Sequence, residues 1–151
     1  MALDDDIASL SRAPLFNLMN GDALRLIAFA AEHRNLKAED MLFTKGERSN
    51  GGFVVTRGSI ALEGDDGEIS FIAEPGALIG QAALFARTTR PAKAKAVESS
   101  AALRISPVLM RRVLQEFPSA AKALRTVLAN ELSIVSGGLE RIRERLAAAD
   151  A

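Results

Sequence analysis

The residues best suited to chemistry lie in one basic stretch, residues 75–97. The whole chain is neutral, with 19 basic and 19 acidic residues, yet this stretch contains no acidic side chain. Its basic residues are Arg87, Arg90, Lys93 and Lys95. A local excess of positive charge favours the binding of an anion, although a solvated basic loop or a surface for an acidic partner has the same composition.

A glycine within this stretch precedes residues that we expect to form a short helical turn, Gln81–Leu84. The first N–H groups of a helix have no carbonyl partners and lie at the positive end of its dipole, so they attract anions. Gly80 would let an anion approach the backbone closely. An arginine returning from the next strand can then hold phosphate oxygens with its planar guanidinium group.

The rest of the composition excludes several kinds of site. The chain has no cysteine, so it forms no disulfide, thiolate nucleophile, Cys-ligated zinc site or iron–sulfur cluster. His33 is the single histidine, which excludes the multi-histidine centres of barrel-shaped metal oxidases. Zero net charge argues against a general nucleic-acid binder. We therefore expect a protein that is not an enzyme and that holds no metal.

Nothing in the sequence marks export or membrane insertion. The first ten residues, MALDDDIASL, are acidic where a signal peptide would be basic. The longest uninterrupted apolar run, Leu26–Ala31, is far too short to cross a bilayer. We expect a cytoplasmic protein without a membrane partner.

Residues 1–35 are predicted to form the N-terminal helices. Asn20 or Asp22 can cap a segment whose apolar residues recur at helical spacing. Pro14 interrupts the pattern before it, so a connector with two large apolar residues is expected there. His33 falls near the end of this region, where we expect it at the surface beside a helix terminus.

In residues 36–105 the apolar residues recur with a period of two, and glycines separate the short alternating runs. Residues 53–55 are β-branched or aromatic, and Gly64–Gly67 has the composition of a hairpin turn between two alternating runs. About seven short strands with a turn every eight to twelve residues predict an antiparallel barrel or sandwich.

Residues 106–151 are predicted to be helical. Ser106 followed by Pro107 is typical of a helix start, and Pro118 begins a longer helix. That helix carries a heptad seam of apolar residues, which predicts a homodimer, although a monomer could bury the same stripe against its own barrel. The seam and predicted dimer interface comprise Leu128, Leu132, Val135, Leu139, Ile142 and Leu146.

The order of the predicted elements resembles that of the cyclic nucleotide-binding domain. It is a helical region, then a barrel with glycines at its turns, then a long helix. Leu42–Glu47 followed by Phe53–Gly58 is similar to one motif of that family, and Pro75–Phe85 followed by Arg90–Ala92 is similar to its phosphate-binding cassette. The resemblance covers roughly residues 7–136. It implies a mainly β fold: an antiparallel double-stranded β-helix (jelly-roll-like) barrel at 36–105, with the cassette at 75–92, N-terminal helices and a long C-terminal helix, in one domain spanning residues 1–151.

The resemblance also implies a function and a set of ligand contacts. The expected protein is a regulatory sensor domain that binds a cyclic nucleotide (cyclic AMP or cyclic GMP) or a related phosphate-bearing ligand and signals through its C-terminal helix. Apart from this ligand, no cofactor is expected. The ligand-binding residues implied are Gly80, Gln81, Ala82, Ala83, Arg90, Pro91, Ala92 and Lys93.

Three positions depart from the family pattern. Gln81 replaces the glutamate that accepts a bond from the ribose, which removes charge assistance worth about 1–2 kcal/mol. Pro91 has no N–H to offer the phosphate. Lys93 stands where the family often has Thr or Ser. A lost carboxylate and added cations would suit a ligand with more negative charge than a cyclic monophosphate.

Two further expectations follow from the resemblance. The same departures also fit an alternative function, a degenerate domain that binds no nucleotide and serves as a dimeric protein-interaction module. Catabolite-activator-like regulators, the closest part of the family, continue into a helix-turn-helix domain, and this sequence ends soon after the long helix. We therefore expect no direct DNA binding from this chain.

Overall fold

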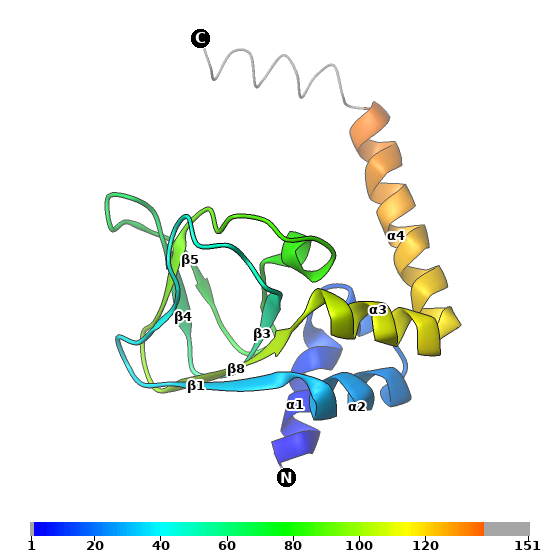
Figure 1. Ribbon diagram of the computed structural model, residues 1–151, viewed down its shortest axis with the longest axis horizontal. Helices are drawn as coiled ribbons and strands as arrows, with labels where there is room; N and C mark the ends of the chain where they lie inside the picture. The colour runs from blue at the N-terminus through cyan, green and yellow to red at the C-terminus, as the bar shows by residue number, and fades with distance from the viewer. Residues whose placement is uncertain (1, 138–151) are drawn as a thin grey trace.

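The computed structural model describes residues 2–137, with side chains from residue 3 to residue 129 (Figure 1). The described elements are helices α1 (Ala2–Arg12), η1 (Phe16–Leu18), α2 (Gly21–Ala30), η2 (Gln81–Leu84), α3 (Pro107–Glu116) and α4 (Pro118–Gly137), and strands β1 (Glu32–Leu36), β2 (Met41–Phe43), β3 (Gly52–Arg57), β4 (Ile60–Glu63), β5 (Ile69–Ala73), β6 (Leu78–Ile79), β7 (Lys93–Ala96) and β8 (Ser100–Ile105). Among these, no helix has the length and apolar character that crossing a membrane requires.

The predicted helix boundaries around the barrel are confirmed where capping residues set them. The Asn20 side chain accepts a hydrogen bond from the backbone N–H of Ala23 at 2.9 Å and caps α2. Ser106 does the same for α3, with Pro107 in the first turn. Helix α1 ends at Arg12, just before Pro14.

The prediction that helices extend through residue 35 is wrong. Strand β1 begins at Glu32 and pairs antiparallel with β8 along its whole length. The strand is polar, so its sequence shows no apolar alternation. Pairing with β8 supplies its backbone hydrogen bonds, and the Arg104 side chain on β8 forms an ion pair with Glu32 at 2.8 Å. His33 therefore lies in a strand and not near the end of a helix.

The strands form two antiparallel four-stranded sheets, in the orders β1-β8-β3-β6 and β2-β7-β4-β5. They face each other as a jelly-roll-like barrel that is not closed into one continuous sheet. Eight strands are described, one more than the sequence indicated. The predicted turn at Gly64–Gly67 joins β4 to β5 as a hairpin.

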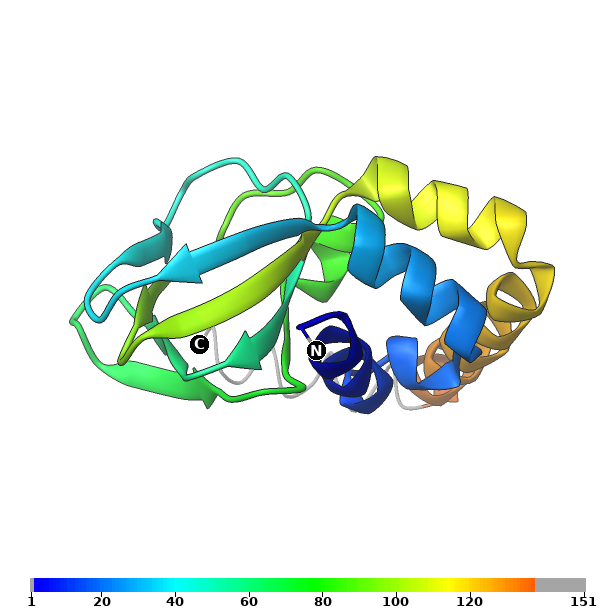
Figure 2. The ribbon, with the colours of Figure 1, turned by 90° about the horizontal axis from the view of Figure 1, so that it is seen from below.

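The sheet β1-β8-β3-β6 is covered on both faces because successive side chains of a strand point to opposite sides. Phe53 and Val55 of β3 point into the barrel, whereas Val54 between them packs with the helices. Figure 2 shows the same arrangement, with the barrel at one end of the molecule and the helices gathered at the other. One strand thus joins two apolar cores.

Helix α4 packs against the rest of the protein through its first turns. Ala120 and Leu124 are buried in the helical core, and Leu128 is half-buried. Of the predicted seam, the side chains of Leu132 and Val135 lie outside the described ones, and Leu139, Ile142 and Leu146 lie outside the described residues. The homodimer stays a prediction.

Replacing Phe16 by alanine tests the helical core. Phe16 is fully buried, so Phe16→Ala is expected to lower the free energy of unfolding by about 3–5 kcal/mol, measured by urea denaturation. Phe29, which is 81% exposed, is the matched control, and Phe29→Ala should change the free energy of unfolding by less than about 0.5 kcal/mol. Equal losses in the two variants would contradict this description of the core.

Candidate functional site

Gly80 and Arg90 lie against each other, as the sequence predicts for a phosphate cassette. Gly80 precedes η2 and has a left-handed backbone conformation, with φ 77° and ψ 53°. A Cβ atom on Gly80 would lie 2.7 Å from Nη1 of Arg90. Glycine is therefore needed here both for the backbone angle and for the close approach of the guanidinium group.

The guanidinium group of Arg90 is buried inside the barrel, and the residue is only 5% exposed. Its Nη2 donates a 2.7 Å hydrogen bond to the carbonyl oxygen of Gly51. Its Cζ lies 4.3 Å from the ring centre of Phe43 and 5.4 Å from that of Phe53, which is cation–π geometry. Neutral groups therefore hold this cation on two sides.

Backbone hydrogen bonds also hold Arg90 in place. The N–H of Arg90 donates to the carbonyl oxygen of Glu47 at 2.8 Å, and the N–H of Gly46 donates to the carbonyl oxygen of Arg90 at 2.9 Å. These bonds tie the end of the cassette to the loop after β2. Gly46 and Glu47, the last two residues of the Leu42–Glu47 motif, thus position the arginine.

Burial lowers the pKa of Arg90, while the charge of Glu47 acts in the opposite direction. The side chain of Glu47 is engaged elsewhere, since its Oε2 accepts a hydrogen bond from the N–H of Thr44 at 3.0 Å. Within the described side chains, no carboxylate lies within 4.0 Å of the Arg90 guanidinium. Arginine stays protonated in proteins, so a buried positive charge remains without an ionic partner.

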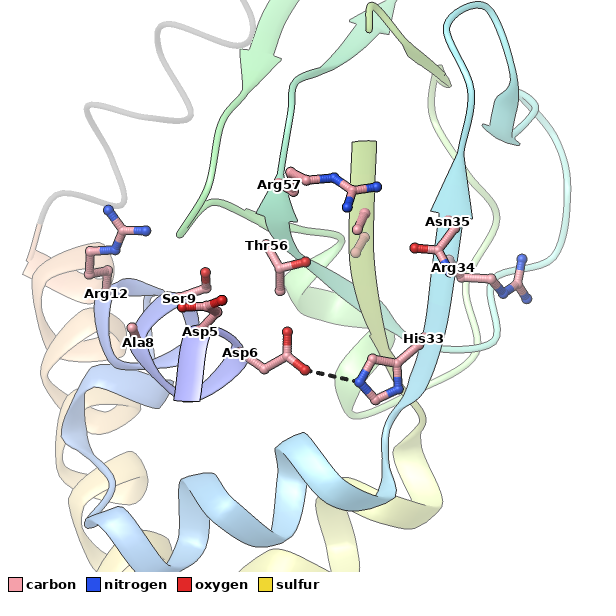
Figure 3. Close-up of a pocket in the computed structure, with 12 residues that line it drawn as sticks. Asp5, Asp6, Ala8, Ser9, Arg12, His33, Arg34, Asn35, Thr56 and Arg57 are labelled. Atoms are coloured by element: carbon pink, nitrogen blue, oxygen red, sulfur yellow. Dashed lines mark hydrogen bonds and ion pairs between the residues drawn. The ribbon is translucent and has the colours of Figure 1, made fainter. Parts of the chain in front are cut away.

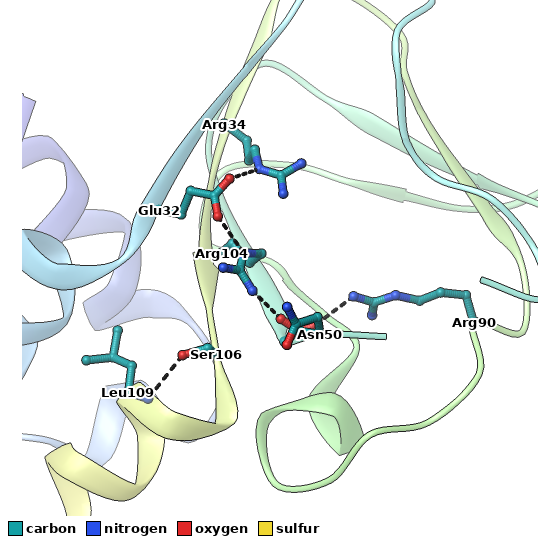
Figure 4. Close-up of polar contacts among 8 residues, drawn as sticks. Glu32, Arg34, Asn50, Arg90, Arg104, Ser106 and Leu109 are labelled. Atoms are coloured by element: carbon teal, nitrogen blue, oxygen red, sulfur yellow. Dashed lines mark hydrogen bonds and ion pairs between the residues drawn. The ribbon is translucent and has the colours of Figure 1, made fainter. Parts of the chain in front are cut away.

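Arg90 opens onto a pocket of about 170 Å³. Glu32 lies at its edge, and Figure 4 shows its carboxylate bound to Arg34 and Arg104, with Arg104 and Arg90 reaching the segment at Asn50 from opposite sides. Hydrogen bonds from Arg104 and then Arg34 lower the pKa of Glu32. The pocket is lined by Arg34, Leu42, Phe43, Glu47, Arg48, Asn50, Phe53, Arg90 and Arg104.

The other predicted contacts of the cassette are less well placed. Gln81 and Ala82 are exposed and do not line the Arg90 pocket. Ala83 is buried, and its N–H is used inside the turn, donating to the carbonyl oxygen of Gly80 at 3.0 Å. Pro91 is exposed and Ala92 is half-buried, and neither lines the pocket.

Lys93 lies on the opposite face of its strand from the barrel interior. Its neighbours Ala94 and Ala96 are fully buried, and alternation along β7 turns Lys93 outward. There its Nζ forms an ion pair with Glu63 at 3.0 Å, and that hydrogen bond lowers the pKa of Glu63. The predicted contact of Lys93 with a ligand inside the barrel therefore does not fit this structure.

Three arginines of the pocket were missed from the sequence: Arg34, Arg48 and Arg104. Arg104 is paired across the sheet with Phe53, which points into the barrel, so Arg104 shares the inner face. The register that establishes this is not visible in one strand alone. A signal was present at Arg48, because it directly follows the Gly46–Glu47 motif.

A larger cavity of about 410 Å³ lies away from the cassette, between α1 and the ends of β1, β3 and β8. There the carboxylate of Asp6 points to the His33 ring, and Asp6 Oδ2 lies 3.0 Å from His33 Nε2 (Figure 3). None of the predicted site residues lines this cavity. Arg12 and Arg57, which also line the larger cavity, are exposed, whereas the smaller pocket contains the buried Arg90, so the smaller pocket is the stronger candidate.

A family model described as "Cyclic nucleotide-binding domain" matches residues 33–117, more than half of the chain. The chain belongs to the cyclic nucleotide-binding domain family. The matched range contains the cassette, Arg90 and both sheets apart from the first residue of β1. No curated protein sequence matches the chain.

Solved structures of similar proteins support this assignment. A cyclic nucleotide-binding-like protein from Brucella abortus is 38% identical, with a TM-score of 0.66 over 74% of this chain and 99% of that one. The N-terminal domain of a Streptomyces coelicolor transcriptional regulator is 25% identical, with a TM-score of 0.78 over 87% of this chain and 94% of that one. The sensor domain of the regulator DNR from Pseudomonas aeruginosa shares the fold at 22% identity, with a TM-score of 0.69 over 86% of this chain and 90% of that one.

The pH dependence of stability tests the ionic edge of the pocket. Since the pKa of folded Glu32 lies below its ordinary value of 4.5, its carboxylate stabilises the fold above about pH 4.5, and this contribution is lost as pH falls through the lowered pKa. Glu32 is 44% exposed, so Glu32→Gln should cost less than about 1 kcal/mol at pH 7. Urea unfolding of the wild-type and Glu32→Gln proteins at pH 7 and pH 3 measures the difference between their free energies of unfolding, which should be smaller at pH 3.

Glu74→Gln is the matched control for Glu32→Gln. Glu74 is an exposed loop glutamate that has no ion pair among the described side chains, so its replacement should have little effect at either pH. If Glu32→Gln lowers the free energy of unfolding by the same amount at both pH values, the ionic role of this carboxylate is contradicted.

Proposed function

We propose that this chain is a non-enzymatic sensor domain that binds a cyclic nucleotide or a related phosphate-bearing ligand at Arg90. The observation that carries the proposal is the buried guanidinium group without a carboxylate partner. Burying a charge without an ionic partner is costly, and a bound anion would offset that cost. Membership of the cyclic nucleotide-binding domain family supports phosphate as that anion.

The contacts around Arg90 leave part of its guanidinium group for a ligand. One N–H bond goes to Gly51, and the two phenylalanine rings contact the group without using its donors. The remaining donors suit the oxygens of a phosphate, which arginine can bind through two parallel bonds. Gly80, which has no Cβ atom, leaves the space that Nη1 of this guanidinium group occupies.

A route from the pocket to the long helix runs through Leu84. This residue ends η2 and is fully buried in the helical core, together with Met110 of α3 and Leu124 of α4. A displacement of η2 on ligand binding would therefore change the packing of both helices. Occupancy of the pocket would shift the population of α4 positions, which is the signal we propose.

We extend the proposal to a homodimer formed by the seam of the C-terminal helix. The heptad spacing of apolar residues in this helix is typical of paired helices. A change in α4 position would then act at the dimer interface.

One observation favours the alternative function, a dimeric interaction module without a ligand. Arg90 is already bonded to Gly51, and the exposed residues Gln81, Ala82 and Pro91 do not line its pocket. A cation whose neutral neighbours already satisfy it would need no ligand. The two functions differ in whether any phosphate compound binds.

A thermal-shift titration separates the two functions. A ligand at one hundred times its dissociation constant stabilises the folded state by about 2.7 kcal/mol, which raises the melting temperature of a chain of this length by about 5–10 °C. The compounds are cyclic AMP, cyclic GMP, ADP and pyrophosphate at millimolar concentration. Arg90→Lys, which keeps the charge and loses the planar fork, should reduce the shift strongly, while Arg87→Ala, in the same loop and exposed, should not.

Two glycine variants provide a second comparison that does not depend on Arg90 itself. Gly80 and Gly67 both have φ 77°, so alanine strains the backbone at each by about 1–2 kcal/mol. Only at Gly80 would the added Cβ displace the Arg90 guanidinium, since Gly67 has open space around it. Gly80→Ala should therefore lose the thermal shift and Gly67→Ala should retain it. No shift with any compound, or a full shift in Gly80→Ala, would contradict the proposed site.

Sedimentation velocity tests the assembly. The wild-type protein is expected to sediment as a dimer, and the double variant Leu139→Glu, Ile142→Glu as a monomer, because two buried charges would separate the helices. Arg143→Gln, off the seam, should remain dimeric. A monomeric wild-type protein at micromolar concentration would contradict the proposed homodimer.

A further inference from the structure

We propose that the ligand of the Arg90 pocket carries two neighbouring phosphate groups, as a nucleoside diphosphate or pyrophosphate does. This inference rests on the proposed function, because it specifies the ligand class of the same site. Three observations carry it: the charge of the pocket lining, the position of Arg48 beside Arg90, and the size of the pocket.

The pocket has more positive charge than one phosphodiester can balance. Four guanidinium groups line it, and the nearby carboxylates are Glu47, which also lines it, and Glu32, which binds Arg34 and Arg104 at its edge. Four cations against two carboxylates leave an excess of two positive charges. The phosphodiester of a cyclic mononucleotide carries one negative charge, whereas a terminal phosphate carries about 1.5–2 at pH 7. The excess therefore favours a ligand with a terminal phosphate, and the position of Arg48 is the argument for a second one.

Arg48 and Arg90 occupy neighbouring positions on two paired segments. The backbone of Arg48 forms an isolated antiparallel bridge with Thr89, the residue before Arg90, and the N–H of Arg90 donates to the carbonyl oxygen of Glu47. Arg48 lies opposite Thr89 and Arg90 is one position further along, so the two side chains leave the paired segments on different faces, yet both line the same pocket. Arg48 is exposed and has no carboxylate within 4.0 Å among the described side chains.

The two arginines also lie at different depths. Arg90 is buried at the inner end of the pocket and Arg48 is exposed toward solvent. A single phosphate on Arg90 would leave Arg48 without an anion. A second phosphate bonded to the first would extend outward toward Arg48, which places one negative group at each cation.

The size of the pocket favours an extended phosphate chain over a cyclic phosphate. At about 170 Å³ it is smaller than the roughly 300 Å³ at which small-molecule sites usually begin. In a cyclic nucleotide the phosphate is closed onto the ribose, so the sugar must enter with it. In a linear diphosphate the phosphates extend beyond the sugar, and they fit the pocket while the nucleoside stays outside.

Isothermal titration calorimetry with cyclic AMP, AMP, ADP and pyrophosphate tests the inference on the full chain. ADP and pyrophosphate are expected to bind at least tenfold more tightly than AMP or cyclic AMP. Arg48→Ala should lower the affinity for ADP and pyrophosphate by about 10- to 100-fold, as expected for loss of a charge-assisted contact. It should change the affinity for cyclic AMP by less than twofold. Arg87→Ala, an exposed arginine that does not line this pocket, is the matched control.

The result that overturns this inference differs from the one that overturns the proposed function. If cyclic AMP binds in an Arg90-dependent way and at least as tightly as ADP, the diphosphate class is wrong and the phosphate site stands. Equal losses of affinity for cyclic AMP and ADP in the Arg48→Ala variant also exclude the diphosphate class. If none of the four compounds binds, the proposed function fails as well.

Discussion

The buried positive charge of Arg90 is the constraint on which the rest of this site depends. A guanidinium group taken out of water without an ionic partner is costly unless other groups compensate for it. The structure provides one carbonyl oxygen and two aromatic rings, which are all neutral. These contacts hold the side chain in one place, and among the described side chains the charge of Glu47 acts on it without forming an ion pair within 4.0 Å. An arginine in that state has a strong affinity for an anion of the right shape, and phosphate matches its planar fork.

The fold explains how such an arginine is held. Strand β3 contributes Phe53 to the barrel and Val54 to the helical core, so the surface that contacts Arg90 is continuous with the packing of the helices. The loop after β2 and the end of the cassette are joined by backbone bonds on both sides of Arg90. At the other end of the cassette, Leu84 is part of the helical core. Helix η2 contacts α3, and Leu84 shares one buried cluster with Leu124 of α4, which is the packing through which the proposed signal would pass.

Most of the fold could be predicted from local sequence signals, whereas much of the site could not. Capping by Asn20 and Ser106 and the turn at Gly64–Gly67 depend on residues close together in the chain, so the sequence alone indicates them. Strand β1 depends on its partner β8, and its polar composition hides it. For the same reason the face on which Lys93 lies, and the presence of Arg34 and Arg104 in the pocket, follow only from the register between strands. Gly80 and Arg90 were found because family motifs mark them.

Direct contact between a phosphate and the Arg90 guanidinium is the interaction on which the proposed function rests. NMR of the Arg90 side chain, assigned by comparison with the Arg90→Lys variant, measures this contact through the Nε–Hε resonance during titration with pyrophosphate and with cyclic AMP. We expect a saturable shift of this resonance with at least one of the two compounds, and no comparable shift of the Arg87 resonance. An Arg90 resonance that stays unchanged at millimolar concentrations of both compounds would contradict phosphate binding at Arg90.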